Sequence, residues 1–161
     1  MKTENADNSC LMKDRHILIA LDESENAKRA ILYAADFLGG VSGFRATIIN
    51  IINVPSEDFF DSVQDRDKWI EEQRAAAEQM LEKYREILIQ SGFKKEKVST
   101  IVDIKENISV ADCILDAQRK LDCCTVIVGR RGISKKEEFI YGSTSSKVLH
   151  SGKNCAVWVI E

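Results

Sequence analysis

The sequence predicts one α/β domain in which helices cover both faces of an open, doubly wound parallel sheet. Short runs rich in Ile and Val alternate with stretches whose apolar residues recur at helical spacing. Every connection between two such runs is long enough to hold a helix that crosses back over the sheet, and strands joined in this way are parallel. The length of 161 residues suits a single domain.

Five of these runs are predicted as strands. They cover residues 16–21, 46–54, 98–104, 124–128 and 155–160. The third run interleaves Ser99 and Asp103 with apolar residues, which is typical of a strand at the edge of a sheet. Right-handed crossovers with a reversal after this third strand give the strand order 3-2-1-4-5. In that order a crevice opens between the carboxyl ends of the first and fourth strands, where α/β sheets bind their ligands.

Helices are predicted over about residues 27–38, 69–91, 111–118 and 143–151. Glycines follow three of them as C-terminal stops. An acidic stretch over 55–68 separates the second strand from the second helix, and it contains Phe59 and Phe60. These two aromatic side chains could close over a ligand or plug the end of the core, and we favour the plug.

Charge and hydropathy exclude several classes of protein. Residues 1–14 are polar and aperiodic, so the domain is expected to span 15–161 after a short tail. The first residues lack the apolar core of a secretion signal, which predicts a cytoplasmic protein. No apolar run approaches the ~20 residues of a membrane helix. The formal net charge of -3 argues against general affinity for nucleic acid, because such affinity needs a basic face.

The cysteines are expected to be reduced thiols in the core. There are five, an odd number, and none of them shows a C-x-x-C spacing. Only two histidines could assist them as ligands, so the sequence predicts no structural zinc site.

Glycines and hydroxyls gather in the segment 129–146, which follows the fourth strand and opens the last helix. Gly129, Gly132 and Gly142 precede four consecutive hydroxyl residues at 143–146. Glycines let the backbone approach a phosphate closely, and a helix N-terminus offers free N–H groups to an anion. Two arginines and two lysines between positions 130 and 136 add positive charge. These residues alone are equally consistent with an ordinary turn, a helix cap and a solvated basic loop.

The spacing Gly129-x2-Gly132-x9-Gly142-Ser143 resembles the nucleotide-binding signature of the universal stress protein family. Residues 16–25 are similar to the first strand of that family with its following Asp and Ser, and residues 155–160 resemble its last strand. The resemblance covers roughly residue 15 to the end of the chain. It implies an open, Rossmann-like sheet of the adenine nucleotide alpha hydrolase-like type, with ATP as the ligand and a homodimer as the assembly.

The resemblance also implies a set of cofactor-binding residues. In chain order they are Ala20, Leu21, Asp22, Ile51, Gly129, Arg130, Arg131, Gly132, Gly142, Ser143, Thr144 and Ser145. The first three lie at the adenosine end, Ile51 lies against the base, and the glycines and hydroxyls surround the phosphates. The family commonly has a small polar residue at the position of Arg130, which could add a phosphate partner or crowd the loop. Arg131 stands where the family has His or Arg.

Asp22 has a second interpretation. With Glu25 three residues later it could form a capping box for the first helix, or Ser24 could cap that helix instead. Its position at the carboxyl end of the first strand favours a contact with ribose or base.

The last predicted strand, 155–160, is apolar on both faces although the strand order places it at an edge. An unprotected apolar edge invites pairing with another strand. Because most homo-oligomers have two-fold symmetry, antiparallel pairing with a second copy is the simple solution, and the resemblance implies it too. Alternatively, the N-terminal tail covers this edge, through Leu11 and Met12.

These observations predict an ATP-binding module that acts in a stress response or in signalling. The phosphate segment offers hydroxyls and cations but no well-placed carboxylate, so ATP hydrolysis is expected to be slow and no catalytic residue is assigned. Mg²⁺ could enter with the nucleotide, and no metal site of the protein itself is predicted. The alternatives are an adenine-nucleotide hydrolase or adenylate-transferring enzyme, and a structural interaction protein whose crevice stays empty.

Overall fold

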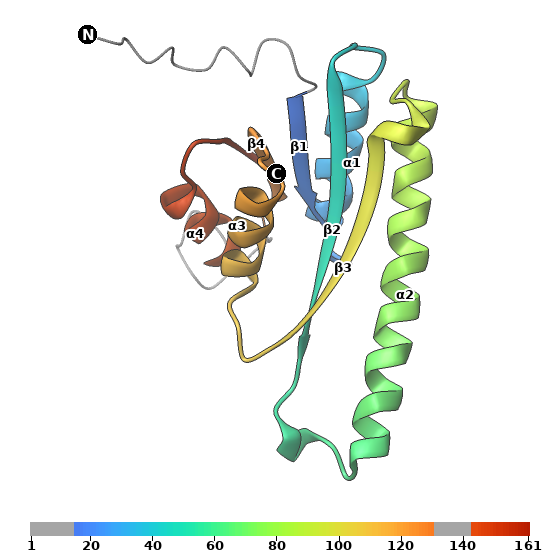
Figure 1. The fold of residues 1–161 in the computed structure, drawn as a ribbon, viewed down its shortest axis with the longest axis vertical. Coiled ribbons are helices and arrows are strands. Elements are labelled where there is room, and N and C mark those ends of the chain that lie inside the picture. Colours follow the sequence, from blue (N-terminus) through green and yellow to red (C-terminus); the bar gives the residue numbers. More distant parts are fainter. Residues whose placement is uncertain (1–14, 131–142) are drawn as a thin grey trace, which may run out of the picture.

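The computed structural model describes residues 15–130 and 143–161 of the chain (Figure 1). Its strands are β1 (Arg15–Ala20), β2 (Phe44–Val54), β3 (Val98–Glu106), β4 (Thr125–Gly129) and β5 (Ala156–Ile160). Its α-helices are α1 (Glu25–Leu38), α2 (Val63–Gln90), α3 (Val110–Lys120) and α4 (Ser143–Ser151). Two 3-10 turns, η2 (Glu57–Phe59) and η3 (Lys95–Lys97), precede α2 and β3.

The five strands form one parallel sheet in the order β3-β2-β1-β4-β5, which confirms the predicted α/β class and strand order. β1 lies at the centre, where Ala20 at its end is level with Ile49 of β2 and Val128 of β4. β2 and β3 pair from Ala46 opposite Val98 to Val54 opposite Glu106, so their ladder is the longest in the sheet.

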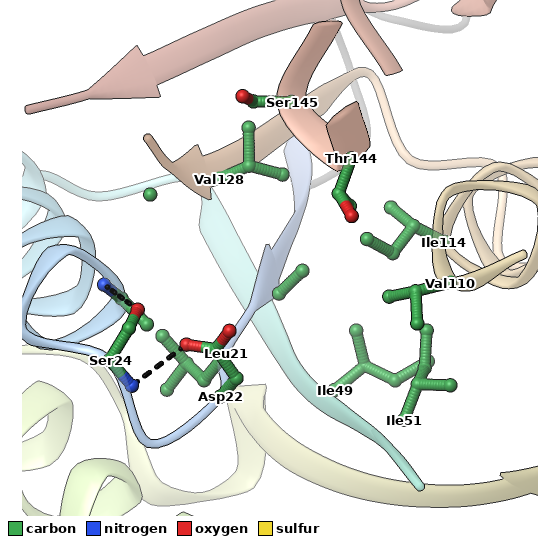
Figure 2. Close-up of a pocket in the computed structure, with 13 residues that line it drawn as sticks. Leu21, Asp22, Ser24, Ile49, Ile51, Val110, Ile114, Val128, Thr144 and Ser145 are labelled. Atoms are coloured by element: carbon green, nitrogen blue, oxygen red, sulfur yellow. Dashed lines mark hydrogen bonds between the residues drawn. The ribbon is translucent and has the colours of Figure 1, made fainter. Parts of the chain in front are cut away.

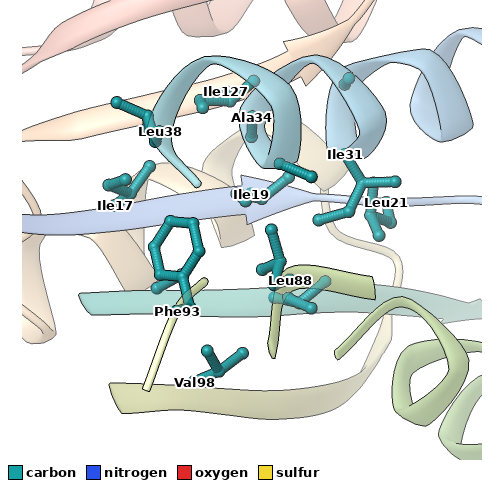
Figure 3. Close-up of a cluster of buried hydrophobic side chains, with 14 of the residues drawn as sticks. Ile17, Ile19, Leu21, Ile31, Ala34, Leu38, Leu88, Phe93, Val98 and Ile127 are labelled. Atoms are coloured by element: carbon teal, nitrogen blue, oxygen red, sulfur yellow. The ribbon is translucent and has the colours of Figure 1, made fainter. Parts of the chain in front are cut away.

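Helices cover both faces of this sheet, and each face has its own core. On one face, residues of α1 and α2 pack on Ile17, Ile19 and Ile127 of the central strands (Figure 3). On the other face, residues of α3 and α4 pack on Leu18 and Val126. Successive residues of β1 therefore serve opposite cores, which is why the sequence of this strand is apolar without alternation.

The second helix begins at Val63, whereas its predicted start was about residue 69. Ser62 caps it: the Ser62 hydroxyl accepts a hydrogen bond from the backbone N–H of Asp65, 3.1 Å away. The buried residues of α2 are Ala77, Leu81 and Leu88, all in its second half. Apolar periodicity arises only where a helix contacts the core, so it could not mark the exposed first half.

The interpretation of Phe59 and Phe60 as a plug for the core is wrong. The side chain of Phe59 is 66% exposed, and η2 contains no buried residue. Phe60 packs edge-on against Trp69 of α2, with ring centroids 5.8 Å apart. Both aromatic residues lie outside the core, in the connection between β2 and α2.

The cysteines of the described residues form no disulfide. Cys113 and Cys123 are buried as expected, and burial raises the pKa of the Cys123 thiol to about 12. Cys124 and Cys155 are only half-buried, at the start of β4 and just before β5. Cys10 lies outside the described residues. Among residues 15–130 and 143–161, no group of three or more His, Cys, Asp or Glu side chains is placed to hold a metal ion.

None of the helices in the described parts of the chain has both the length and the hydropathy needed to cross a membrane.

A buried histidine links the three strands β1, β2 and β3. Nδ1 of His16 lies 3.0 Å from the carbonyl oxygen of Leu121, and Nε2 lies 2.7 Å from the hydroxyl oxygen of Thr47. The Thr47 hydroxyl in turn lies 2.8 Å from that of Ser99. Because a carbonyl only accepts, Nδ1 carries the proton in the neutral ring and Nε2 accepts from Thr47. Burial, the largest influence on this ring, lowers the pKa of His16 below 6.5.

We expect the stability of the fold to depend on pH through His16. Its pKa is lower in the folded chain than in the unfolded chain, so the unfolded chain binds more protons below about pH 6.5. This contribution to the free energy of unfolding is complete above pH 6.5 and declines as the pH falls towards the folded pKa. Urea unfolding of the wild type and of His16→Gln should be measured at several pH values from 6.5 downward. The free energy of unfolding should depend less steeply on pH in the variant. Identical slopes would contradict the prediction.

Candidate functional site

A pocket of about 120 Å³ lies at the carboxyl ends of the central strands, where the predicted crevice opens (Figure 2). Its walls come from β1, β2 and β4 and from the beginnings of α1, α3 and α4. The lining residues are Ala20, Leu21, Asp22, Ser24, Ala27, Ile49, Ile51, Val110, Ile114, Val128, Gly129, Thr144 and Ser145.

One wall of the pocket is apolar. Ile49 and Ile51 project from β2, and Val110 and Ile114 of α3 lie beside them in Figure 2. Ile49 and Ile51 are two positions apart on a strand, so both point to the same face of the sheet. This wall suits a flat, largely apolar group such as an aromatic ring.

The turn after β1 presents a carboxylate at a fixed position. Asp22 Oδ1 accepts a hydrogen bond from the backbone N–H of Ser24 at 2.9 Å, and the Ser24 hydroxyl accepts one from the N–H of Ala27 at 3.1 Å. Ser24 is therefore the cap of α1, and the alternative in which Asp22 caps this helix in a box with Glu25 is wrong. The carbonyl of Leu21 is held by the side-chain amide of the buried Asn50, 2.8 Å away.

The start of α4 forms the polar wall opposite this turn. In Figure 2 the Thr144 hydroxyl lies beside Ile114, and Ser145 lies above Val128. Ser145 is buried, whereas Ser143 is exposed and does not line the pocket. The first N–H groups of an α-helix have no partner within the helix and carry its positive dipole end. This wall is therefore suited to an anionic group.

An ion pair ties α4 to α3 behind the pocket. Lys147 Nζ lies 2.6 Å from Asp112 Oδ2 and 3.3 Å from the Ser109 hydroxyl. The hydrogen bond from Lys147 lowers the pKa of the Asp112 carboxyl, so the pair persists at neutral pH. This pair links α4, which carries the polar wall, to α3, which carries part of the apolar wall.

Gly129, at the end of β4, allows the first turn of α1 to approach the sheet. A Cβ atom at this position would lie 2.5 Å from the carbonyl carbon of Asn26 and 2.6 Å from the backbone nitrogen of Ala27. Contacts this short do not occur, so any larger residue would push α1 and β4 apart. The glycine therefore fixes how closely the two sides of the pocket meet.

Arg130 turns away from the pocket. Its guanidinium pairs with Glu161 at 2.6 Å, and its backbone N–H donates to the Ile160 carbonyl at 2.7 Å. The side chain of Asn26 donates to the Arg130 carbonyl. Arg130 does not line the pocket, and its Nη1 is held by Glu161.

The structure brings seven of the predicted site residues together around one pocket: Ala20, Leu21, Asp22, Ile51, Gly129, Thr144 and Ser145. Arg131, Gly132 and Gly142 lie outside the described residues. The pocket also contains apolar residues that were not predicted as site residues: Ala27, Ile49, Val110, Ile114 and Val128. The even spacing of Ile49 and Ile51 could have identified Ile49.

A second hollow, of about 260 Å³, lies over β2 and β3 beside α3. Ile49, Ile101 and Leu121 form its floor, and Asp103 and Lys105 at its rim pair with each other at 3.2 Å. It has the larger volume, but no helix N-terminus opens into it among its lining residues. The pocket at the strand ends is the better candidate because apolar and polar walls converge there.

Comparisons with known proteins agree with this fold. The model of the universal stress protein family matches residues 14–161. Universal stress protein Sll1388 from Synechocystis sp. is 29% identical over 156 residues, which cover 90% of this chain and 96% of that protein.

Solved structures share the fold. A universal stress protein in complex with cAMP has a TM-score of 0.67 and 13% identity, and the match covers 92% of this chain and 98% of that chain. The universal stress protein from Archaeoglobus fulgidus in complex with dAMP has a TM-score of 0.63 and 18% identity, and the match covers 91% and 98% of the two chains. Because the family model spans almost all of the sheet and helices described above, this chain belongs to the universal stress protein family.

Proposed function

We propose that this protein is a cytoplasmic, dimeric ATP-binding module whose pocket at the strand ends holds the nucleotide. The observation that carries the proposal is the division of that pocket into an apolar wall on β2 and α3 and a polar wall at the start of α4. An adenine nucleotide has the same division, with a flat base at one end and phosphates at the other. The relatives in complex with cAMP and dAMP support an adenine nucleotide as the class of ligand.

The pocket suggests one orientation of the nucleotide. The base would pack on Ile49, Ile51 and Val110, where apolar side chains exclude water. The ribose would lie near Asp22, because a carboxylate accepts hydrogen bonds from hydroxyl groups. The phosphates would meet the N-terminus of α4 at Thr144 and Ser145.

Rapid turnover is not expected from this arrangement. Asp22 is the one carboxylate residue that lines the pocket among the described residues, and Figure 2 shows it across the pocket from Thr144. A phosphoryl-transfer enzyme needs a nucleophile or a base beside the transferred phosphate, usually with ligands for Mg²⁺. Mg²⁺ would therefore enter with the nucleotide, as a counter-ion of its phosphates.

The edge strand β5 supports the proposed homodimer. Its central residues are half-buried, and no described strand pairs with its outer edge. Trp158 of β5 packs edge-on against Tyr33 and Phe37 of α1, yet these two rings remain 44% and 58% exposed. Antiparallel pairing with a second β5 would give hydrogen-bond partners to the backbone N–H and C=O groups of the outer edge. It would also bring a further apolar surface next to these rings.

The nucleotide site is tested by Thr144→Val, which keeps the shape of the side chain and removes its hydroxyl. We expect the affinity for ATP in calorimetry to fall about tenfold, because hydrogen bonds to charged groups are among the stronger ones. Thr100→Val, on the exposed part of β3 outside the pocket, is the matched control and should bind like the wild type. Equal affinity for all three proteins, or no binding of ATP, would overturn the proposed site. Mass spectrometry of nucleotide released from the purified protein identifies the natural ligand.

The binding role is distinguished from an enzyme by turnover. We expect slow ATP hydrolysis at saturating ATP, and Asp22→Asn should leave this maximal rate within a few-fold of the wild type, since the carboxylate lies across the pocket from the phosphate wall. Phosphate release measured over time provides the test. Rapid ATP consumption that disappears in Asp22→Asn would instead establish a hydrolase or an adenylate-transferring enzyme.

The dimer is tested by Val159→Lys, which places a charge on the edge strand. We expect sedimentation to report a dimer for the wild type and a monomer for this variant, because a buried lysine without a partner opposes pairing. Val41→Lys, in an exposed turn between α1 and β2, is the control and should remain dimeric. A monomeric wild type would exclude the proposed assembly.

A further inference from the structure

The β2–α2 connection projects beyond the rest of the described chain. Figure 1 shows η2 and the first turns of α2 extending past the ends of the other elements. We refer to residues 55–76 as the arm. No residue of the arm is buried, and the first buried residue of α2 is Ala77. The arm therefore contributes little to the core, although it is regular structure.

Aromatic and aliphatic side chains are concentrated at the tip of the arm. Phe59 and Phe60 pack edge-on with ring centroids 5.0 Å apart, and Phe60 packs in the same manner on Trp69. Phe59 is 66% exposed and Val63 is 68% exposed. A row of rings that supports an exposed apolar surface outside the core is typical of a protein interaction site.

The tip of the arm also carries uncompensated negative charge. The carboxylates of Glu57, Asp58 and Asp61 are exposed, and none makes an ion pair or a hydrogen bond with a described residue. The basic side chains of the arm are already paired with acidic neighbours. These pairs are Arg66 with Asp67 and Glu106, Lys68 with Glu72, and Arg74 with Glu71.

The arm is held in place before any partner arrives. Ser62 and Asp65 exchange hydrogen bonds at the start of α2, with the Ser62 hydroxyl donating to Asp65 Oδ2 at 2.6 Å. Arg66 pairs with Glu106 at the end of β3, which attaches the arm to the sheet. A surface that is already ordered loses less conformational entropy on binding.

We propose that the tip of the arm docks a cationic amphipathic segment of a partner protein. An apolar side chain of the partner packs on Phe59 and Val63, and its Arg or Lys side chains meet the carboxylates of Glu57, Asp58 and Asp61. Guanidinium groups also stack favourably on aromatic rings. The negative charge disfavours nucleic acid and anionic lipid surfaces as partners. This surface shares no residue with the nucleotide pocket.

The test uses the full chain and a fluorescently labelled synthetic helix of leucine and arginine in an amphipathic repeat. We expect fluorescence anisotropy to show binding that weakens as salt is added, and no binding of a leucine–glutamate helix of the same pattern. Phe59→Ser should weaken binding about tenfold, which corresponds to the loss of one buried apolar side chain. The triple variant Glu57→Gln, Asp58→Asn, Asp61→Asn should also weaken binding and flatten its dependence on salt.

Matched variants elsewhere on the surface localise the effect. Leu32→Ser removes another exposed apolar side chain, and the triple variant Asp36→Asn, Glu78→Gln, Glu96→Gln removes three carboxylates outside the arm. Both should bind the leucine–arginine helix like the wild type. Equal losses in the arm variants and these controls would overturn the proposal, as would binding of the leucine–glutamate helix or of anionic phospholipid vesicles. An absence of binding to the wild type would overturn it as well.

Discussion

The position of β1 between β2 and β4 is the constraint on which the rest of this structure depends. β1 pairs in parallel with both neighbours, and Ala20 at its end is level with Ile49 on one side and Val128 on the other. α1, which follows β1, packs with α2 on one face of the sheet, and α4, the next described element after β4, packs with α3 on the other. Because the helices that follow β1 and β4 lie on opposite faces of the sheet, the pocket formed by the described residues lies at the strand ends between them.

Local chemistry then turns this gap into a site with two different walls. The cap at Ser24 fixes Asp22, and Gly129 lets α1 lie directly against β4. The pair of Lys147 with Asp112 holds the start of α4 beside α3. None of these contacts needs a ligand, so the apolar and polar walls are in place before any ligand binds. Preorganisation of this kind limits the entropy lost on binding.

The sequence predicted the sheet well because each strand can be identified from its own local composition, a short run rich in Ile and Val. β1, β2 and β4 are apolar on successive residues, and their crossovers leave one plausible strand order. Other features depend on contacts between distant parts of the chain, and these could not be predicted. Arg130 was predicted to add a phosphate contact or to crowd the loop, but its partner is Glu161, which is distant in the sequence and follows the neighbouring end of β5. The start of α2 was missed because that part of the helix touches no core.

The arm shows why exposed regular structure is informative. The β2–β3 ladder continues to Val54 opposite Glu106, and Glu106 there holds Arg66 of α2. A connection that only had to join two elements could be a short loop of polar residues, since loops of this kind are common between strands and helices. Here β2, β3 and the first half of α2 are long, and Phe59, Phe60 and Trp69 lie at a distance from the core. Apolar side chains exposed on an ordered support carry a risk of aggregation, which is offset when a partner covers them. The exposed carboxylates of Glu57, Asp58 and Asp61, which lie near Phe59 and Phe60 in the sequence, favour a partner with a positive charge.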